Sequence, residues 1–296
     1  MNKKNLFGLF LCVLIFFVGF SLQGNLGMYF NLAGCLIVIG GTLGATLVCY
    51  RVEQLKIVSS VLVASYRSRV KEPEEIVELL VDLSVKSRFK GILSLEEDES
   101  ETTILFLRRA LGFLVDRLPA EYIRESLTTE MYFFKMRRED CERVLRNMAS
   151  FAPSFGLAGS VVGLIGMLAG VGDTESILKT VPIALTSTLY GVVLSNFFFS
   201  PFATIIEERT NQELLLQKII MEGVIAIESE MDPRLLEHKL KSFITPSSRH
   251  IKLVSLERIQ ERFNIRPKKA APQRPGAGAG ASGPAGREPL PDKGPG

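Results

Sequence analysis

The sequence predicts an all-α polytopic membrane protein with four transmembrane helices, a helical cytoplasmic insert between the second and third spans, and a disordered C-terminal tail. Three observations predict this fold class. The mean hydropathy is positive, +0.22, although 23% of the residues are charged, which indicates that the apolar residues are gathered in blocks. Four blocks hold no charged residue and approach the ~20 residues that cross a hydrocarbon layer. The segments between them repeat apolar residues at helical spacing.

The first two blocks, residues 6–22 and 28–48, predict a transmembrane hairpin over residues 1–49. Lys3 and Lys4 followed by an apolar block are typical of a secretory signal. However, no small-residue cleavage site follows, and the second block comes almost at once. We therefore expect the first block to be a transmembrane helix of the protein.

The other two blocks, residues 151–171 and 181–206, predict a second hairpin over residues 151–206, with a loop of about nine residues between them. The two short loops hold one basic residue, Lys179, whereas basic residues flank the opposite ends of the blocks. The flanking residues are Lys3, Lys4, Arg51, Lys56, Arg143, Arg146 and Arg209. By the positive-inside rule, both termini and the central region are cytoplasmic.

The soluble parts of the chain also carry helical patterns. Residues 50–150 form a predicted cytoplasmic helical domain, and Pro73 suits the first turn of one of its helices. Residues 207–245 predict further cytoplasmic helices, interrupted at Asp232 and Pro233. Residues 246–296 are basic and rich in Pro, Gly and Ala, so they cannot bury enough apolar surface to fold. The apolar stripes of the central domain are Ile76, Leu79, Leu80 and Leu83; Leu107, Leu111, Leu114 and Leu118; and Ile123, Leu127, Met131 and Phe134.

Charge and composition exclude several classes of function. The net charge of +3 is too small to predict binding to nucleic acid, because acids offset the bases of the central region. The cysteines have no disulfide or metal-binding spacing. His238 and His250, the only histidines, lie near the tail without evident metal or nucleophile partners. We therefore expect no cofactor, no metal site and no enzymatic activity.

Three motifs in order carry a family resemblance. Residues 88–96 read RFKGILSLE, residues 152–168 read APSFGLAGSVVGLIGML, and residues 184–191 read ALTSTLYG, with Asn196 and Pro201 after them. Together they resemble the MotA/PomA flagellar motor stator family, within the MotA/TolQ/ExbB proton channel superfamily. The resemblance covers roughly residues 26 to 245.

The resemblance implies a function in flagellar rotation. It implies a homo-oligomeric ring in the bacterial inner membrane around a MotB-like single-span partner, whose membrane Asp binds the ion. Ion flow through this channel would be converted into torque on the rotor switch-complex protein FliG. Besides membrane lipid, these proteins are the partners that we expect.

The predicted spans contain no Asp, Glu, Lys, Arg or His, so the titrating group of a channel must come from a partner. Ser160, Ser187 and Thr188 supply hydroxyls that suit an ion pathway, and the resemblance implies this role for Ser160 and Thr188. The alternative, strongest for Thr186 and Ser187, is a bond to the carbonyl one turn back. Serine at position 160, where sodium-driven relatives tend to have threonine, favours protons over sodium.

Two prolines and two charged residues complete the candidate site. Pro153 and Pro201 lie near the cytoplasmic ends of their spans, and the resemblance implies that they couple ion passage to movement of the cytoplasmic domain. The alternative is a simple span boundary. Arg88 and Glu96 bracket a loop that turns at Gly91, and the resemblance implies that they contact the rotor. The alternative is a solvated loop, since exposed charges contribute little to stability.

Two other functions stay open on the sequence alone. An ExbB/TolQ-like energiser of outer-membrane transport shares the hairpin chemistry but has three spans and no rotor-contact loop. A membrane scaffold that conducts nothing is the other. The glycines along residues 151–171 favour close helix packing, within one subunit or between subunits of a ring.

Overall fold

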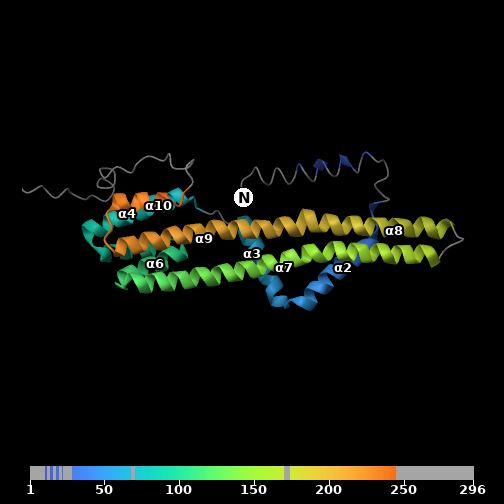
Figure 1. Ribbon diagram of the computed structural model, residues 1–296, viewed down its shortest axis with the longest axis horizontal. Helices are drawn as coiled ribbons and strands as arrows, with labels where there is room; N and C mark the ends of the chain where they lie inside the picture. The colour runs from blue at the N-terminus through green and yellow to red at the C-terminus, as the bar shows by residue number, and fades with distance from the viewer. Residues whose placement is uncertain are drawn as a thin grey trace, which may run out of the picture. The chain divides into compact units, whose positions relative to one another are not determined.

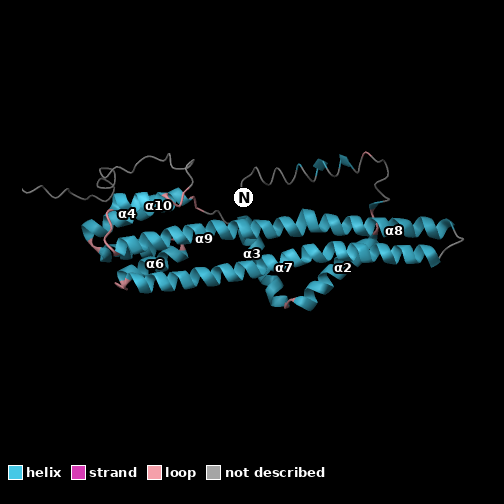
Figure 2. Cartoon of the chain, viewed as in Figure 1, coloured by secondary structure: helices cyan, strands magenta, loops and turns pink. Residues whose placement is uncertain are grey.

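The computed structural model describes residues 29–67, 71–169 and 174–244, with isolated positions between 11 and 22. Every element in these described ranges is helical (Figures 1 and 2), which confirms the all-α part of the predicted fold class. The predicted span 6–22 and the predicted tail 246–296 lie outside them. The elements are α2 (Leu32–Cys49), α3 (Val52–Arg67), α4 (Pro73–Lys90), the 3-10 helix η2 (Ile92–Leu95), α5 (Glu96–Glu101), α6 (Leu105–Val115), α7 (Ala120–Ala169), α8 (Thr174–Val193), the π-helix η3 (Leu194–Phe199), α9 (Ser200–Glu228) and α10 (Pro233–Lys241).

The longest helix, α7, connects the central domain to the third predicted span without a break. Its 50 residues extend ~75 Å at 1.5 Å per residue, more than twice the ~30 Å of a hydrocarbon layer. The apolar stripe that begins at Ile123 and the predicted span as far as Ala169 are therefore parts of one helix. Pro153 lies inside this helix without ending it.

A second long helical path begins at Thr174, inside the predicted loop, and runs through α8, η3 and α9 to Glu228. The predicted span 181–206 occupies its middle. Val193 and Phe199, at the two ends of η3, keep α-helical backbone angles, so the π-helix is an insertion in a continuous helix. The path packs along α7 over most of its length (Figure 1).

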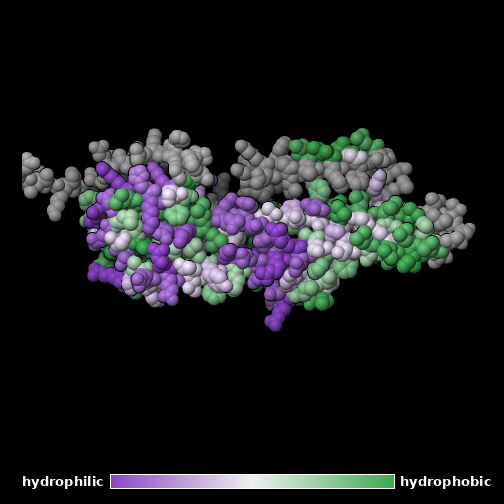
Figure 3. Space-filling view, viewed as in Figure 1, coloured by the Kyte–Doolittle hydropathy of each residue, from purple (hydrophilic) through white to green (hydrophobic). Residues whose placement is uncertain are grey.

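Three helical stretches in the described residues are long and apolar enough to cross a membrane: Leu32–Cys49, Ala120–Leu168 and Ala184–Glu228. They overlap most of the second, third and fourth predicted spans. Figure 3 shows hydrophobic side chains gathered over α8 and the adjoining ends of α7 and α2, and hydrophilic ones over α4 and α6. The helix α2 begins four residues after the predicted span 28–48 does, because the Asn31 side chain accepts from Gly34 N at 3.0 Å and caps it.

A compact core fixes the helical head, by which we mean α4, η2, α5, α6, α10 and the adjoining parts of α7 and α9. Pro73 opens α4, as predicted. The predicted stripes supply its core, although Leu79, Leu118, Met131 and Phe134 are only half-buried. The fully buried side chains of the head include Ile76, Leu80, Leu83, Leu95, Leu107, Leu111, Leu114, Ile123, Leu127, Ile219, Ile220, Leu236 and Leu240.

A smaller apolar cluster lies between the head and the predicted membrane hairpins. Val58 of α3 meets Cys141 of α7 and Ile206 of α9 there, and Asn147 Nδ2 of α7 donates to the Tyr50 hydroxyl at 2.5 Å. Burial raises the pKa of the Cys141 thiol, so this cysteine is an unreactive packing residue. The cluster holds α3 against both long helices.

Candidate functional site

The hydroxyls of Ser160 and Thr188 meet where α7 packs against α8. The two side chains are hydrogen bonded to each other. Ser160 Oγ also donates to the Ala184 carbonyl across the helix contact, with an oxygen to oxygen distance of 2.5 Å, and lies 3.1 Å from Gly156 O of its own helix. Both residues are half-buried. The structure therefore brings these two predicted pathway residues together on one face of the α7–α8 contact.

Ser187, the third predicted pathway residue, lies in a different place. It is fully buried at the junction of α2, α7 and α8. A Cβ added to Gly34 or to Gly159 would lie 2.7 Å from the Ser187 side chain, so glycine in α2 and in α7 makes room for it. The sequence analysis included Ser187 in the ion pathway but gave it the stronger alternative of a bond within its own helix, and in the structure its hydroxyl and that of Thr188 occupy different surroundings.

Pro153 lies in the contact between α7 and α8. A Cβ added to Gly191 would be 2.5 Å from the Ala152 carbonyl and 3.0 Å from Pro153 Cα, so only glycine admits this contact. Pro201 lies in the first turn of α9, directly after η3. The proline and the π-helix thus interrupt the regular hydrogen bonding of the second path at one place. The sequence indicated the two prolines but not the π-helix.

Arg88 pairs with a residue that the sequence indicated only as part of a helix break. Its guanidinium lies 3.1 Å from Asp232 Oδ2, and both side chains are half-exposed. The other carboxylate oxygen, Asp232 Oδ1, accepts from Arg234 N at 2.9 Å and caps α10. The hydrogen bond from Arg234 N, together with the charge of Arg88, holds the pKa of Asp232 below its ordinary value. Arg88 is therefore oriented by α10.

The predicted turn at Gly91 is confirmed, because this residue ends α4 with φ +87°, a region that favours glycine. Lys86, which precedes the turn in α4 and has 8% of its side chain exposed, is paired with two residues that follow the turn. Its Nζ lies 2.6 Å from Asp98 Oδ2 and 3.6 Å from Glu97 Oε2. Burial alone would lower the pKa of Lys86, but the hydrogen bond to Asp98 and the two nearby charges outweigh it and raise this pKa.

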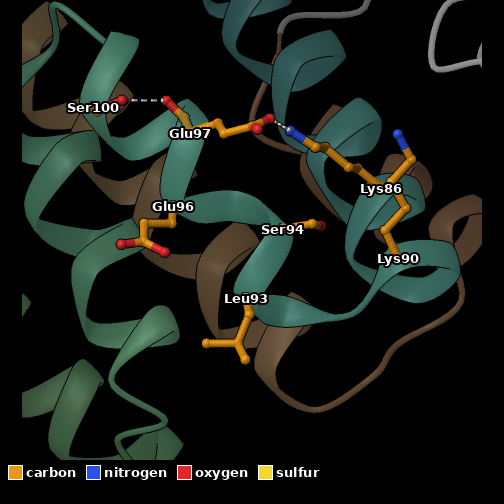
Figure 4. A pocket seen from close by; sticks show the side chains of 7 residues that line it. All are labelled: Lys86, Lys90, Leu93, Ser94, Glu96, Glu97 and Ser100. Atoms are coloured by element: carbon orange, nitrogen blue, oxygen red, sulfur yellow. Dashed lines mark hydrogen bonds and ion pairs between the residues drawn. The ribbon is translucent and has the colours of Figure 1, made fainter.

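Glu96 is exposed beside a groove of about 490 Å³ on this turn (Figure 4). Its basic side is formed by Lys86 and Lys90 and its acidic side by Glu96 and Glu97, with the exposed side chain of Leu93 between them. Ser94 and Ser100 complete the lining. The arrangement can bind a surface that carries charges of both signs around an apolar residue.

A buried carboxylate joins three helices of the head. Glu222 of α9 accepts from Arg124 of α7 at 3.0 Å and from Lys239 of α10 at 2.7 Å, and Lys218 lies 3.4 Å away. Burial by itself would raise the pKa of Glu222, but the bonds from Lys239 and Arg124 outweigh it and lower this pKa to about 2. Glu222 thus stays ionised and fixes α10, which presents Asp232 to Arg88.

Sequence reasoning missed Asp232, Lys86 and Glu222 as supports of the site. A lysine on the buried face of α4, three residues after Leu83, was the one available signal, because such a charge needs a partner.

Within the described residues, no group of three or more His, Cys, Asp or Glu side chains is arranged to hold a metal ion.

Comparison with known proteins matches the chain to motility proteins. Residues 98–218 match the model of the MotA/TolQ/ExbB proton channel family. The chain is 30% identical over 253 residues to the chemotaxis protein PomA of Vibrio alginolyticus, which covers 86% of this chain and 99% of that protein.

Solved structures show the same fold. One chain of C. jejuni MotAB superposes with a TM-score of 0.79 at 24% identity, covering 85% of this chain and 99% of the other. One chain of the flagellar MotAB stator complex from Bacillus subtilis gives a TM-score of 0.78 at 26% identity, covering 84% and 98%. The motif order, the helical arrangement and the similarity to PomA over nearly its full length lead to one conclusion: the chain belongs to the MotA/PomA flagellar motor stator family, a branch of the MotA/TolQ/ExbB proton channel family.

Proposed function

We propose that this chain is a flagellar stator subunit that forms a proton channel with a MotB-like single-span partner and converts proton flow into torque on the rotor. The observation that carries the proposal is the pair of hydroxyls from Ser160 and Thr188 on helices whose apolar stretches hold no Asp, Glu, Lys, Arg or His. Hydroxyls can pass a proton through water but cannot bind it as a carboxylate does, so the partner must supply the Asp.

The partner and the assembly follow from the same absence of charge. A chain whose spans lack Asp, Glu, Lys, Arg and His is expected to form only one part of a channel, and the similar solved structures are MotAB complexes. Exposed apolar side chains along α2 and α7, such as Leu36, Leu43, Val161 and Ile165, suit contact with lipid and with other copies in a ring. We place the chain in the bacterial inner membrane with four spans and both termini cytoplasmic.

The torque-bearing surface that we propose is the charged turn of the head. Arg88 is oriented by Asp232, and Glu96 lies on the acidic side of the groove. Opposite charges displayed on a firmly held turn can grip a complementary surface and steer its approach, which suits the rotor protein FliG. Pro153 and Pro201 lie between this head and the hydroxyl pair along the two long helices, which suits a role in coupling.

The ExbB/TolQ-like energiser is the other function within the same family model. The PomA relative and the MotAB structures favour the stator. So does the supported charged turn that carries Arg88 and Glu96, which an energiser of outer-membrane transport does not need.

The test of the channel is Ser160→Ala combined with Thr188→Ala, expressed in a strain that lacks the native gene. We expect the double variant to reach the membrane and to lose most swimming motility, because the hydroxyl pair that would hand on a proton is gone. Ser154→Ala is the matched control, since this exposed serine of α7 bonds to Ser150 O of its own helix at 3.1 Å. Unaltered motility of the double variant would remove the support for a channel role.

A further inference from the structure

Pro153 leaves a gap in the hydrogen bonding of α7. In an α-helix the N–H of residue 153 would donate to the carbonyl of Ala149, four residues earlier, but proline has no N–H. A main-chain carbonyl inside a packed helix pair needs another donor, because an unpaired one costs free energy. The neighbouring helical path supplies that donor.

The donor is the hydroxyl of Ser195. Its Oγ lies 2.6 Å from Ala149 O and donates to it, and the residue is only 7% exposed. Gly191, one turn earlier in α8, lies against the main chain of Ala152 and Pro153. The bond is therefore made where the backbones of the two paths already touch.

Ser195 is also part of the second irregularity. It belongs to the π-helix η3, and its carbonyl accepts from Ser200 N, five residues on, directly before Pro201. One residue thus completes the hydrogen bonding of α7 at Pro153 with its side chain and closes a wide turn before Pro201 with its main chain.

We propose that Ser195 is a positioning residue that ties α7 at Pro153 to the π-helix before Pro201. The inference rests on the stator function proposed above and assigns the coupling between the two prolines to one hydrogen bond. While the bond holds, the two long helices cannot bend independently at this level, and a displacement of α7 carries the start of α9 with it. A serine that only fills space would not need to donate to this carbonyl.

The structural test is a double-mutant cycle on melting temperature, measured on the full chain purified with its partner. Ser195→Ala is expected to lower the melting temperature by about 2–4 °C, because Ala149 O then lacks a donor. Pro153→Ala restores the N–H, so adding Ser195→Ala to it is expected to change the melting temperature by less than half as much. Equal effects of Ser195→Ala in both backgrounds would overturn the assigned bond.

The functional test is torque per stator unit, measured with beads on flagellar stubs while counting fluorescently tagged units. We expect Ser195→Ala to lower torque per unit at least twofold with unchanged unit number, and Ser195→Thr, which keeps the hydroxyl, to restore it. Ser200→Ala, at an exposed serine close by, should behave as wild type. Wild-type torque from Ser195→Ala, or equal losses from the Ala and Thr variants, would overturn the coupling role. Failure of the wild-type chain to restore rotation would instead contradict the proposed function, while the melting cycle would still report on the bond.

Discussion

Glu222 shows what a single residue contributes to holding the head together. Both of its carboxylate oxygens accept hydrogen bonds from cations on other helices, Arg124 and Lys239. Its pKa of about 2 lies below the ordinary 4.5, so the folded state binds this proton more weakly than the unfolded state does. The stabilisation is therefore complete above about pH 4.5 and is lost as the pH falls from 4.5 towards 2.

We predict that Glu222→Gln lowers the free energy of unfolding by about 1.5–3 kcal/mol at pH 7, the usual contribution of hydrogen bonds to a charged group. Melting followed by circular dichroism in detergent should show a gap between wild type and variant that narrows between pH 4.5 and pH 2. Glu78→Gln, at an exposed carboxylate of α4, is the control. A gap that stays constant as the pH falls to 2 would contradict the assigned ion pairs.

Single residues also show the limits of sequence reading. The family resemblance indicated Ser160 and Thr188, and they do meet across the α7–α8 contact. Helical spacing cannot say that Ser187 is enclosed by glycines of two other helices, because that depends on how three segments far apart in the chain pack together. The pairing of Arg88 with Asp232 joins residues 144 positions apart and was hidden for the same reason.

At the scale of elements, the charged turn depends on a buried ion pair. The ammonium of Lys86 fixes α5 through Asp98, and removing one member of such a pair leaves the other uncompensated. We predict that Lys86→Met speeds amide hydrogen exchange in residues 91–101, whereas Lys90→Met, at an exposed lysine of the same helix, does not. Hydrogen exchange measured by mass spectrometry checks this. Unchanged exchange in Lys86→Met would show that apolar contacts of the head hold the turn without the ion pair.

The contact of α7 with α8 gives a second prediction for an element. In Gly191→Ala the new Cβ would lie 2.5 Å from the Ala152 carbonyl, which is part of the main chain and cannot turn aside. Overpacking of this kind costs about 1–3 kcal/mol, so the melting temperature should fall. Gly44→Ala, at a glycine of α2 with nothing within 4 Å, should melt like wild type in the isolated chain. Equal melting of both variants would mean that the helices are not in contact at Gly191.

Element boundaries were harder to predict than element types. Apolar spacing predicted helices in the head and in the spans, and Pro73 and Gly91 marked two boundaries correctly. Nothing in composition shows that a membrane span and a head helix form one helix, as in α7, because helical propensity does not change at the membrane surface. The π-helix before Pro201 depends on packing against α7 and leaves no periodic signal.

For the whole molecule, we predict the membrane topology. From the positive-inside rule, three apolar stretches in the described residues and the predicted fourth span at residues 6–22, we expect both termini to lie in the cytoplasm. Alkaline phosphatase fused after Gly296 should be inactive and a fluorescent protein there should be bright, whereas phosphatase inserted in residues 170–173 should be active. A reporter showing the N-terminus outside the cytoplasm would indicate three spans and favour the energiser.

The central claim is that this chain couples proton entry to flagellar rotation, and the rotation of tethered cells tests it most directly. The gene would be deleted in the bacterium that carries it and restored on a plasmid, and rotation speed would be followed while a protonophore collapses the proton potential or sodium is withdrawn. We expect that flagella of the deletion strain are assembled but do not turn and that the restored chain turns them. Rotation should stop with the protonophore and continue without sodium. Undiminished rotation in the deletion strain, or rotation that survives the protonophore and stops without sodium, would contradict this claim.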